Sequence, residues 1–88
     1  MISDHERKTI ADVAARYKTG RVLLFGSGLL SDDPRDIDLA VEGLAPRSFF
    51  RFYGDLLLAL AKPVDLIDLS VESMFTRLVR LEGLKIYG

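Results

Sequence analysis

Two aspartates with one residue between them, Asp36 and Asp38, are the side chains whose type and spacing most directly suggest chemistry. Alternate side chains of a strand point to the same face, which puts the two carboxylates on one face with their backbone positions about 6.5 Å apart. Carboxylates placed in this way can share a divalent cation, because such cations prefer oxygen ligands. The pair therefore predicts a metal site at the start of a strand.

A glycine and a serine precede the aspartates, at the end of the apolar run 22–25. Gly26 has no Cβ and so lets the backbone approach a bulky anion, and Ser27 offers a hydroxyl and an N–H to a phosphate. Carboxylates for a metal and a Gly-Ser corner for a phosphate are the parts that metal-assisted phosphoryl or nucleotidyl transfer requires.

Two other candidates for chemistry are assigned no role. The acidic segment 31–36 does not fit an EF-hand, because Ile37 stands where that loop needs glycine and Gly43 where it needs glutamate. His5 has no partner ligands at metal-binding spacing, and we interpret it as a solvated residue of a helix start.

Composition sets the class of protein. The 88 residues make one domain, 1–88, and the near balance of 12 basic and 13 acidic residues disfavours direct binding of nucleic acid or a membrane surface. The chain has no cysteine, no secretory leader pattern and no apolar run near the roughly 20 residues of a membrane span, so a cytoplasmic location is expected. The hydrophobic fraction, 49%, is high enough to suggest a partner surface.

Helical and alternating spacing predict the elements that must position the site. Ser3 and Glu6 match a capping box, Gly20 stands where a helix would end in a left-handed residue, and Ser70 is expected to cap the last helix. The predicted elements, in order, are a helix over 3–18, strands over 21–25 and 36–41, a helix over 46–61, a strand over 63–69, a helix that ends at Gly83 and an edge strand over 84–87.

The helix over 46–61 carries more apolar side chains than one face of a small sheet can cover. The inward stripe is expected to be Phe49, Phe52, Tyr53, Leu56 and Leu60. The outward apolar residues are then Phe50, Leu57 and Leu58, which either meet another chain, a homo-oligomer included, or belong to the domain's own core. In the last helix, the inward residues are expected to be Met74, Phe75, Leu78 and Val79.

One topology brings the candidate residues together. The first two strands must run antiparallel if both are to serve one site, and the helical crossover makes the third strand parallel to the second. The fold class is then α+β, a small mixed sheet flanked by helices in the order α-β-β-α-β-α. Asp65 joins Asp36 and Asp38 at the same end of the sheet. It is preferred to Asp68 because it lies closer to the start of the strand, and Asp68 is expected to face the other way.

The ordered set F-G-S, D-I-D-L and V-D-L-I-D-L resembles the minimal nucleotidyltransferases of the DNA polymerase β superfamily, over about residues 10–87. The resemblance implies that Gly26 and Ser27 contact the triphosphate of ATP, the usual donor. It also implies that Asp36 and Asp38 hold Mg²⁺ or Mn²⁺, with Asp65 as the third carboxylate. Single-domain members of this size pair with an all-α toxin of the HEPN class.

The sequence departs from that family at two points. The spacer between Ser27 and Asp36 is short, and the arginine that often follows the Gly-Ser pair is absent, with Leu29 in that region. Arg35 is the residue expected to neutralise the phosphates in its place. Two functions remain open: an antitoxin that adenylylates its toxin, and a catalytically silent relative that neutralises its partner by binding alone.

Overall fold

The computed structural model describes every residue except 27–28, 30 and 32–33, and it begins with helix α1, Asp4–Arg16. The Ser3 hydroxyl accepts the Glu6 N–H while the Glu6 carboxylate accepts the Ser3 N–H, which confirms the capping box. The left-handed residue after the helix is Lys18, with φ 54°, and the prediction of Gly20 for that position is wrong. Gly20 instead allows close approach, since a Cβ on it would lie 3.0 Å from the carbonyl oxygen of Glu42.

Four strands form one mixed sheet in the order β3-β2-β1-β4. Their bounds are β1 Arg21–Phe25, β2 Ile37–Glu42, β3 Val64–Asp68 and β4 Leu84–Tyr87. Strand β1 runs antiparallel to both β2 and β4, whereas β3 runs parallel to β2. The predicted strand directions and the predicted edge strand are therefore confirmed, and so is the α+β fold class.

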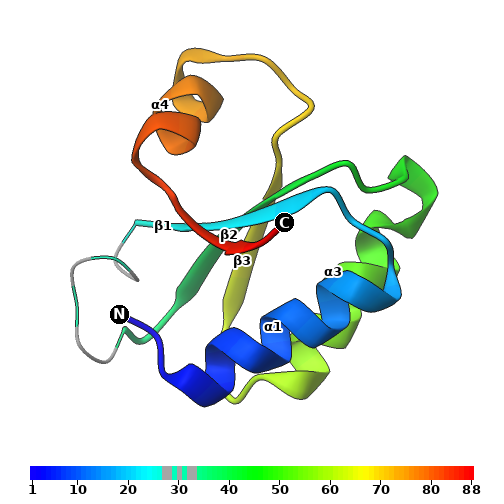
Figure 1. The fold of residues 1–88 in the computed structure, drawn as a ribbon, viewed down its shortest axis with the longest axis vertical. Helices are drawn as coiled ribbons and strands as arrows, with labels where there is room; N and C mark the ends of the chain where they lie inside the picture. The colour runs from blue at the N-terminus through cyan, green and yellow to red at the C-terminus, as the bar shows by residue number, and fades with distance from the viewer. Residues whose placement is uncertain (27–28, 30, 32–33) are drawn as a thin grey trace.

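Helices α1 and α3 lie side by side on one face of the sheet (Figure 1), where they enclose the main core. Helix α3, Phe49–Ala59, follows a single 3-10 turn, η1, Pro46–Ser48. The predicted helix over 46–61 is therefore too long at both ends. Its first three residues form the 3-10 turn, and the backbone is already extended at Leu60, which leads toward β3. The buried residues of this core include Ile10, Val13, Val22, Leu24, Ile37, Leu39, Phe52 and Leu56.

The predicted facing of α3 is correct. Its inward stripe is buried or half-buried, whereas Phe50 and Leu58 are 83% and 88% exposed and Leu57 is 48% exposed. The hydroxyl of Tyr17 at the end of α1 donates to Asp55 at 2.5 Å, which ties the two helices together. This hydrogen bond is also the largest cause of the raised pKa of Tyr17.

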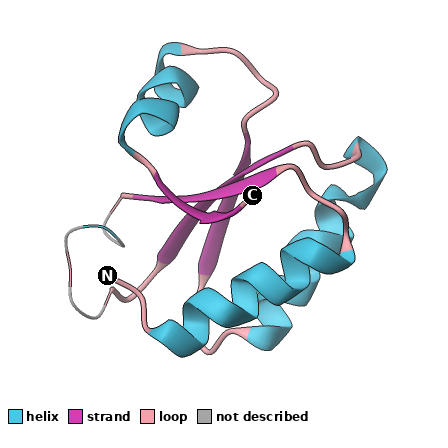
Figure 2. Ribbon diagram, in the orientation of Figure 1, coloured by secondary structure: helices cyan, strands magenta, loops and turns pink. Residues whose placement is uncertain are grey.

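Of the helices that the structure describes with bounds, α4, Met74–Glu82, is the one that lies over the opposite face (Figure 2). It covers only a small cluster, made by Leu23, Ala40, Leu69 and Val79. The N-cap is Ser73, which forms a capping box with Thr76, so the predicted cap at Ser70 is wrong by three residues. The Ser70 N–H instead donates to the carboxylate of Asp68 in the preceding turn.

The predicted inward stripe of α4 is largely wrong. Only Thr76 and Val79 are buried in this helix, while Met74 is 87% exposed and Phe75 and Leu78 are about half exposed. The helix is turned so that Arg80, rather than Leu78, reaches back to the sheet. None of the helices in the described part of the chain is long and apolar enough to cross a membrane.

Candidate active site

Asp38 and Asp65 stand beside one another at the start of two parallel strands. Asp38 is the second residue of β2 and Asp65 the second of β3, and the register pairs them directly. Because residues paired across neighbouring strands point to the same face, both carboxylates lie on the face that α4 partly covers. Asp36 occupies the bend just before β2 and is exposed, as Asp65 is, whereas Asp38 is half-buried.

The structure places Asp68 on the other face. It pairs with Val41, whose side chain lies in the core beneath α1 and α3, and its carboxylate accepts the Ser70 N–H at 2.9 Å. The predicted facing of the strand, with Asp65 rather than Asp68 beside Asp38, therefore agrees with the register. The role of Asp65 stays a prediction.

Gly26 brings the main chain against the carboxylate of Asp38. Phe25, the last residue of β1, pairs with Asp38, and the chain turns at Gly26 with φ +67°. A Cβ built on Gly26 would lie 2.4 Å from Oδ2 of Asp38, and the backbone conformation is one that other residues rarely adopt. The position therefore requires glycine, which lets the main chain approach this carboxylate closely.

The segment after Gly26 is described only in part. Ser27, the predicted phosphate contact, lies outside the described residues. Leu29 packs against the edge of the main core, and its N–H donates to the carbonyl oxygen of Gly26 at 3.1 Å. Arg35, predicted to neutralise the phosphates, is exposed in the bend that precedes β2.

The donor set suits Mg²⁺. Among the residues that the structure describes, no three side chains of His, Cys, Asp or Glu are gathered closely enough to form a metal-holding cluster. Mg²⁺ is usually held by one or two carboxylates together with substrate phosphates, so a preformed cluster of three is not required. Asp38 with Asp36 offers hard oxygen ligands, and Gly26 places no side chain against Asp38, so these residues fit the ion.

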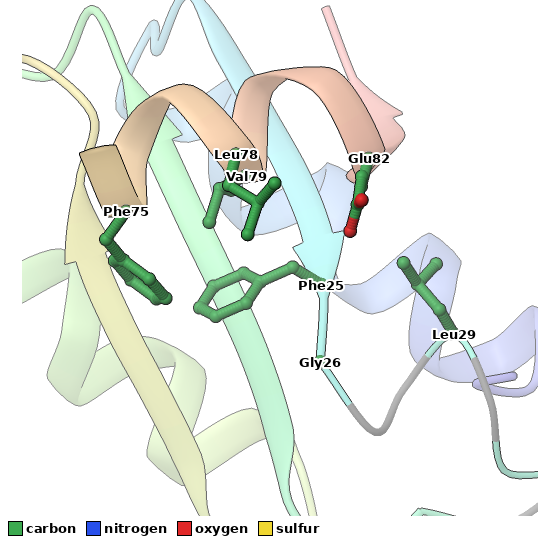
Figure 3. A pocket seen from close by; sticks show the side chains of 7 residues that line it. All are labelled: Phe25, Gly26, Leu29, Phe75, Leu78, Val79 and Glu82. Carbon is green, nitrogen blue, oxygen red and sulfur yellow. The ribbon is translucent and has the colours of Figure 1, made fainter. Parts of the chain in front are cut away.

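A pocket of about 210 Å³ opens beside the aspartates, between the end of β1 and α4 (Figure 3). Its lining is made by Phe25, Gly26, Leu29, Phe75, Leu78, Val79 and Glu82. No site role is predicted for Phe25 or Glu82 from the sequence. Strand alternation would have placed Phe25 on the face of Asp38, but the position of Glu82 depends on how α4 docks, which no local pattern reports.

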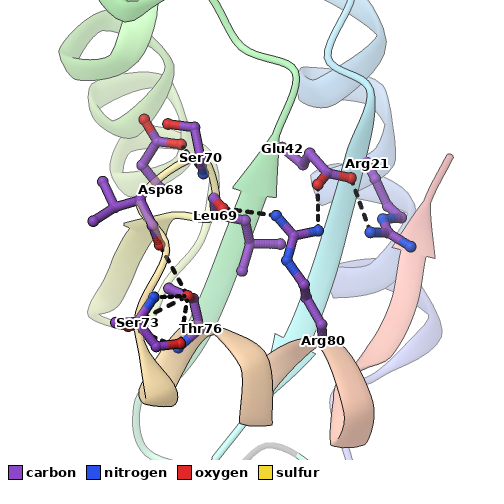
Figure 4. A network of polar contacts seen from close by, with 9 residues as sticks. Arg21, Glu42, Asp68, Leu69, Ser70, Ser73, Thr76 and Arg80 are labelled. Carbon is purple, nitrogen blue, oxygen red and sulfur yellow. Dashed lines mark hydrogen bonds and ion pairs between the residues drawn. The ribbon is translucent and has the colours of Figure 1, made fainter.

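A polar network fixes α4 to the sheet (Figure 4). The carboxylate of Glu42, at the end of β2, accepts from Arg80 of α4 and from Arg21 of β1, the latter at 2.8 Å. Arg80 also donates to the carbonyl oxygen of Leu69 at 2.7 Å. The hydrogen bond from Arg80 is the largest cause of the lowered pKa of Glu42, and the charge of Arg21 adds to it.

Comparison with protein-family models and with curated protein sequences gives no match. Solved structures do match. A toxin-antitoxin crystal structure with AMP-PNP is 28% identical with a TM-score of 0.76, over 93% of this chain and 73% of the other. A mutant of the MntA-HpeT toxin-antitoxin matches at 25% identity and TM-score 0.76, over 93% and 72% of the two chains.

The MntA-HepT toxin-antitoxin matches at 25% identity and TM-score 0.74, over 98% of this chain and 73% of the other. MntA is a minimal nucleotidyltransferase, and its likeness to this chain extends over the sheet and the helices on both of its faces. The resemblance drawn from the sequence is thereby confirmed: the chain has the nucleotidyltransferase fold and is similar to the minimal nucleotidyltransferases of toxin-antitoxin systems.

Proposed function

We propose that this protein is a Mg²⁺-dependent nucleotidyltransferase that transfers AMP from ATP to a hydroxyl group of a partner toxin, and so acts as an antitoxin. The observation that carries the proposal is the contact of Gly26 with Asp38, in register with Asp65. It brings main chain that carries no side chain next to two carboxylates at one end of the sheet. This is the arrangement that metal-assisted attack on a phosphate needs.

The related structures support the same chemistry. One of them contains AMP-PNP, a nucleotide, together with a toxin and its antitoxin. Another carries Asp-to-Glu substitutions at two positions with one residue between them, which is the spacing of Asp36 and Asp38 in this chain. A partner toxin of helical HEPN type is the acceptor that the family resemblance implies.

In the proposed mechanism, Asp36 and Asp38 hold the ion and Gly26 lets the triphosphate lie against them. Bound Mg²⁺ supplies charge neutralisation of the triphosphate and of the pyrophosphate that leaves. The acceptor oxygen forms a bond to the α-phosphorus as the bond from that phosphorus to the bridging oxygen breaks. Asp65 accepts the hydroxyl proton, for which its exposed position beside Asp38 is suited. Positioning and charge provide most of the rate, so no histidine or cysteine is needed.

A catalytically silent antitoxin is the second candidate. The exposed apolar side chains of α3, Phe50 and Leu58 above all, favour it because they offer a binding surface that needs no chemistry. The short segment between Gly26 and Asp36, which carries only Arg35 as a basic residue, favours it as well.

Transfer of label from α-phosphate-labelled ATP distinguishes the two functions. With Mg²⁺ and the helical protein encoded beside this one, the wild type should label the partner. Asp38→Asn and Asp65→Asn should both abolish labelling, because each removes a carboxylate at the site. Asp68→Asn is the matched control and should keep most activity, since Asp68 lies on the opposite face.

Each result selects one function. A partner that binds the wild type yet stays unlabelled would establish the silent antitoxin. Loss of labelling in Asp68→Asn but not in Asp65→Asn would overturn the assignment of the proton acceptor. Circular dichroism of each variant shows whether the fold is intact, and so distinguishes unfolding from loss of catalysis.

A further inference from the structure

Among the described residues, those that line the pocket between β1 and α4 give it apolar walls and one acidic group, Glu82, at its rim. Phe25 and Phe75 form one wall, with ring centroids 5.8 Å apart and planes at 78° to one another. The carboxylate of Glu82, at the end of α4, points toward the space between Phe25 and Leu29 (Figure 3). The other lining side chains are those of Leu78 and Val79. Flat apolar walls and one acceptor group suit a flat ring that carries an N–H donor.

Gly26 joins this pocket to the aspartates. It lines the pocket, and the place where its Cβ would be lies 2.4 Å from Oδ2 of Asp38. A ligand whose phosphates bind beside Asp38 can therefore pass Gly26 and put its other end into the pocket. The volume, about 210 Å³, is below the roughly 300 Å³ at which pockets for drug-sized ligands begin. It suits a single ring system rather than a whole nucleotide.

We infer that this pocket holds the base of the nucleoside triphosphate and that Glu82 selects bases that carry an exocyclic amino group. The inference rests on the proposed nucleotidyl transfer, and it adds the residues that bind and choose the base. Stacking on Phe25 or Phe75 accepts any base, because every base has a π-face. Among the described side chains that line the pocket, Glu82 is the one that carries a polar group, so we assign the discrimination to it.

The chemistry of a carboxylate decides which bases are favoured. An ionised carboxylate only accepts hydrogen bonds. Glu82 therefore attracts the amino group of adenine and repels the carbonyl oxygen that hypoxanthine carries at the same ring position. Cytosine and guanine also carry amino groups, so this argument does not rank CTP and GTP against ATP. Their affinities must be measured.

Binding of ATP and ITP in the presence of Mg²⁺, measured by calorimetry, tests the inference. These two nucleotides differ at one position of the base, amino against carbonyl. The wild type should bind ATP about tenfold more tightly than ITP, because one hydrogen bond to a charged group contributes a free energy of about that size. Glu82→Gln should bring this ratio close to one, because the amide can donate to the carbonyl of ITP. GTP and CTP, measured in parallel, report which amino-bearing base fits best.

Two further variants separate base selection from general effects. Glu72→Gln removes the same charge beside the start of α4 and outside the pocket, so it should leave the ATP to ITP ratio unchanged. Phe75→Ala should weaken both nucleotides about equally, since it removes stacking and not selection. Phe75 is 53% exposed, so the fold should tolerate this change.

The outcomes also separate this inference from the proposed function. Equal affinity of the wild type for ATP and ITP, or a ratio that Glu82→Gln leaves unchanged, overturns the role of Glu82 while nucleotide binding stands. Wild type that binds no nucleotide overturns both. Tight binding that Phe75→Ala does not weaken places the base outside this pocket.

Discussion

At the scale of single residues, the proposed approach of a phosphate to the carboxylates depends on how closely Gly26 lies to Asp38. Gly26 has φ +67°, and a Cβ built on it would lie 2.4 Å from Oδ2 of Asp38. A glycine at this position therefore serves both the backbone conformation and the access to the site. Replacing Gly26 with alanine, which adds one methyl group, tests both requirements.

Gly26→Ala should lower activity far more than it lowers stability. The positive φ costs about 1–2 kcal/mol for alanine, while the new Cβ meets the end of a flexible side chain, which can move. Displacing the carboxylate of Asp38 by about 1 Å should reduce transfer roughly 100-fold. Labelled-ATP transfer and urea denaturation measure the two effects.

Gly54→Ala provides the matched control. Gly54 lies within α3, and a Cβ on it would meet nothing within 4 Å. Alanine there should stabilise the protein by up to about 1 kcal/mol and leave transfer unchanged. Equal activity of the two alanine variants would mean that Gly26 is not an approach for phosphates.

Much of the site at this scale could be predicted from the sequence. Strand alternation placed Asp38 and Asp65 on one face, and the register agrees. Glu82 could not be found in the same way, because its proximity to Phe25 depends on where α4 docks on the sheet. Side chains brought together by tertiary packing leave no period in the sequence.

At the scale of elements, the docking of α4 depends on few contacts. Among the described residues, the buried cluster between α4 and the sheet is small: Leu23, Ala40 and Leu69, with Val79 of α4 itself. The link from Arg80 to Glu42 and to the carbonyl oxygen of Leu69 therefore carries a larger share of its attachment than an ion pair on a well-packed helix would. Arg21 approaches the same carboxylate from β1.

Glu42→Gln should destabilise the protein at neutral pH and make little difference in acid. The pKa of Glu42 is lowered below its ordinary value of 4.5, so its ionised form is favoured in the folded state. The stabilisation is complete above about pH 4.5 and is lost as the pH falls through the lowered pKa. Because the side chain is about one-third exposed, the expected cost at pH 7 is only about 1 kcal/mol.

Urea denaturation of both proteins from pH 7 to pH 3 measures this difference. Glu72→Gln is the control, because its partner Arg77 lies 3.7 Å away and both side chains are more than two-thirds exposed. It should change stability by less than about 0.5 kcal/mol at any pH. A wild-type advantage over Glu42→Gln that persists at pH 3 would contradict the role of the carboxylate charge.

The start of α4 shows why an element boundary is hard to predict. Ser70 and Ser73 are both good N-cap residues, and local preference does not distinguish them. Thr76 decides the matter, because its hydroxyl accepts the Ser73 N–H and donates to the carbonyl oxygen of Val71. Met74 is therefore the first residue of the helix, and it is exposed rather than buried.

At the scale of the whole molecule, apolar side chains remain exposed on both sides of the sheet. On α3 they are Phe50, Leu57 and Leu58, as the excess of apolar residues in that helix predicted. On α4, Met74 and Leu81 are 87% and 83% exposed, which the sequence analysis did not foresee. A chain of 88 residues has too few layers to cover both surfaces. We therefore propose that a partner, either the helical toxin or a second copy, covers the outward side of α3.

Phe50→Glu should weaken this association without unfolding the chain. Phe50 is 83% exposed, so its replacement removes no core contact, whereas a buried carboxylate at an interface would be left without a partner. Loss of an aromatic anchor of this kind costs about 2 kcal/mol or more, which raises the dissociation constant roughly 30-fold. Analytical ultracentrifugation gives the oligomeric state, and calorimetry with the helical partner gives the dissociation constant.

Lys8→Gln serves as the control for Phe50→Glu. Lys8 is exposed on α1, and its replacement lowers the net charge by one, as Phe50→Glu does. If the weakening came from net charge, both variants would show it, and if it comes from the apolar surface of α3, only Phe50→Glu will. A wild type that stays monomeric at micromolar concentration and does not bind the helical protein would show that this surface has no partner. The exposed phenylalanine would then be one of the apolar side chains that small domains leave in solvent.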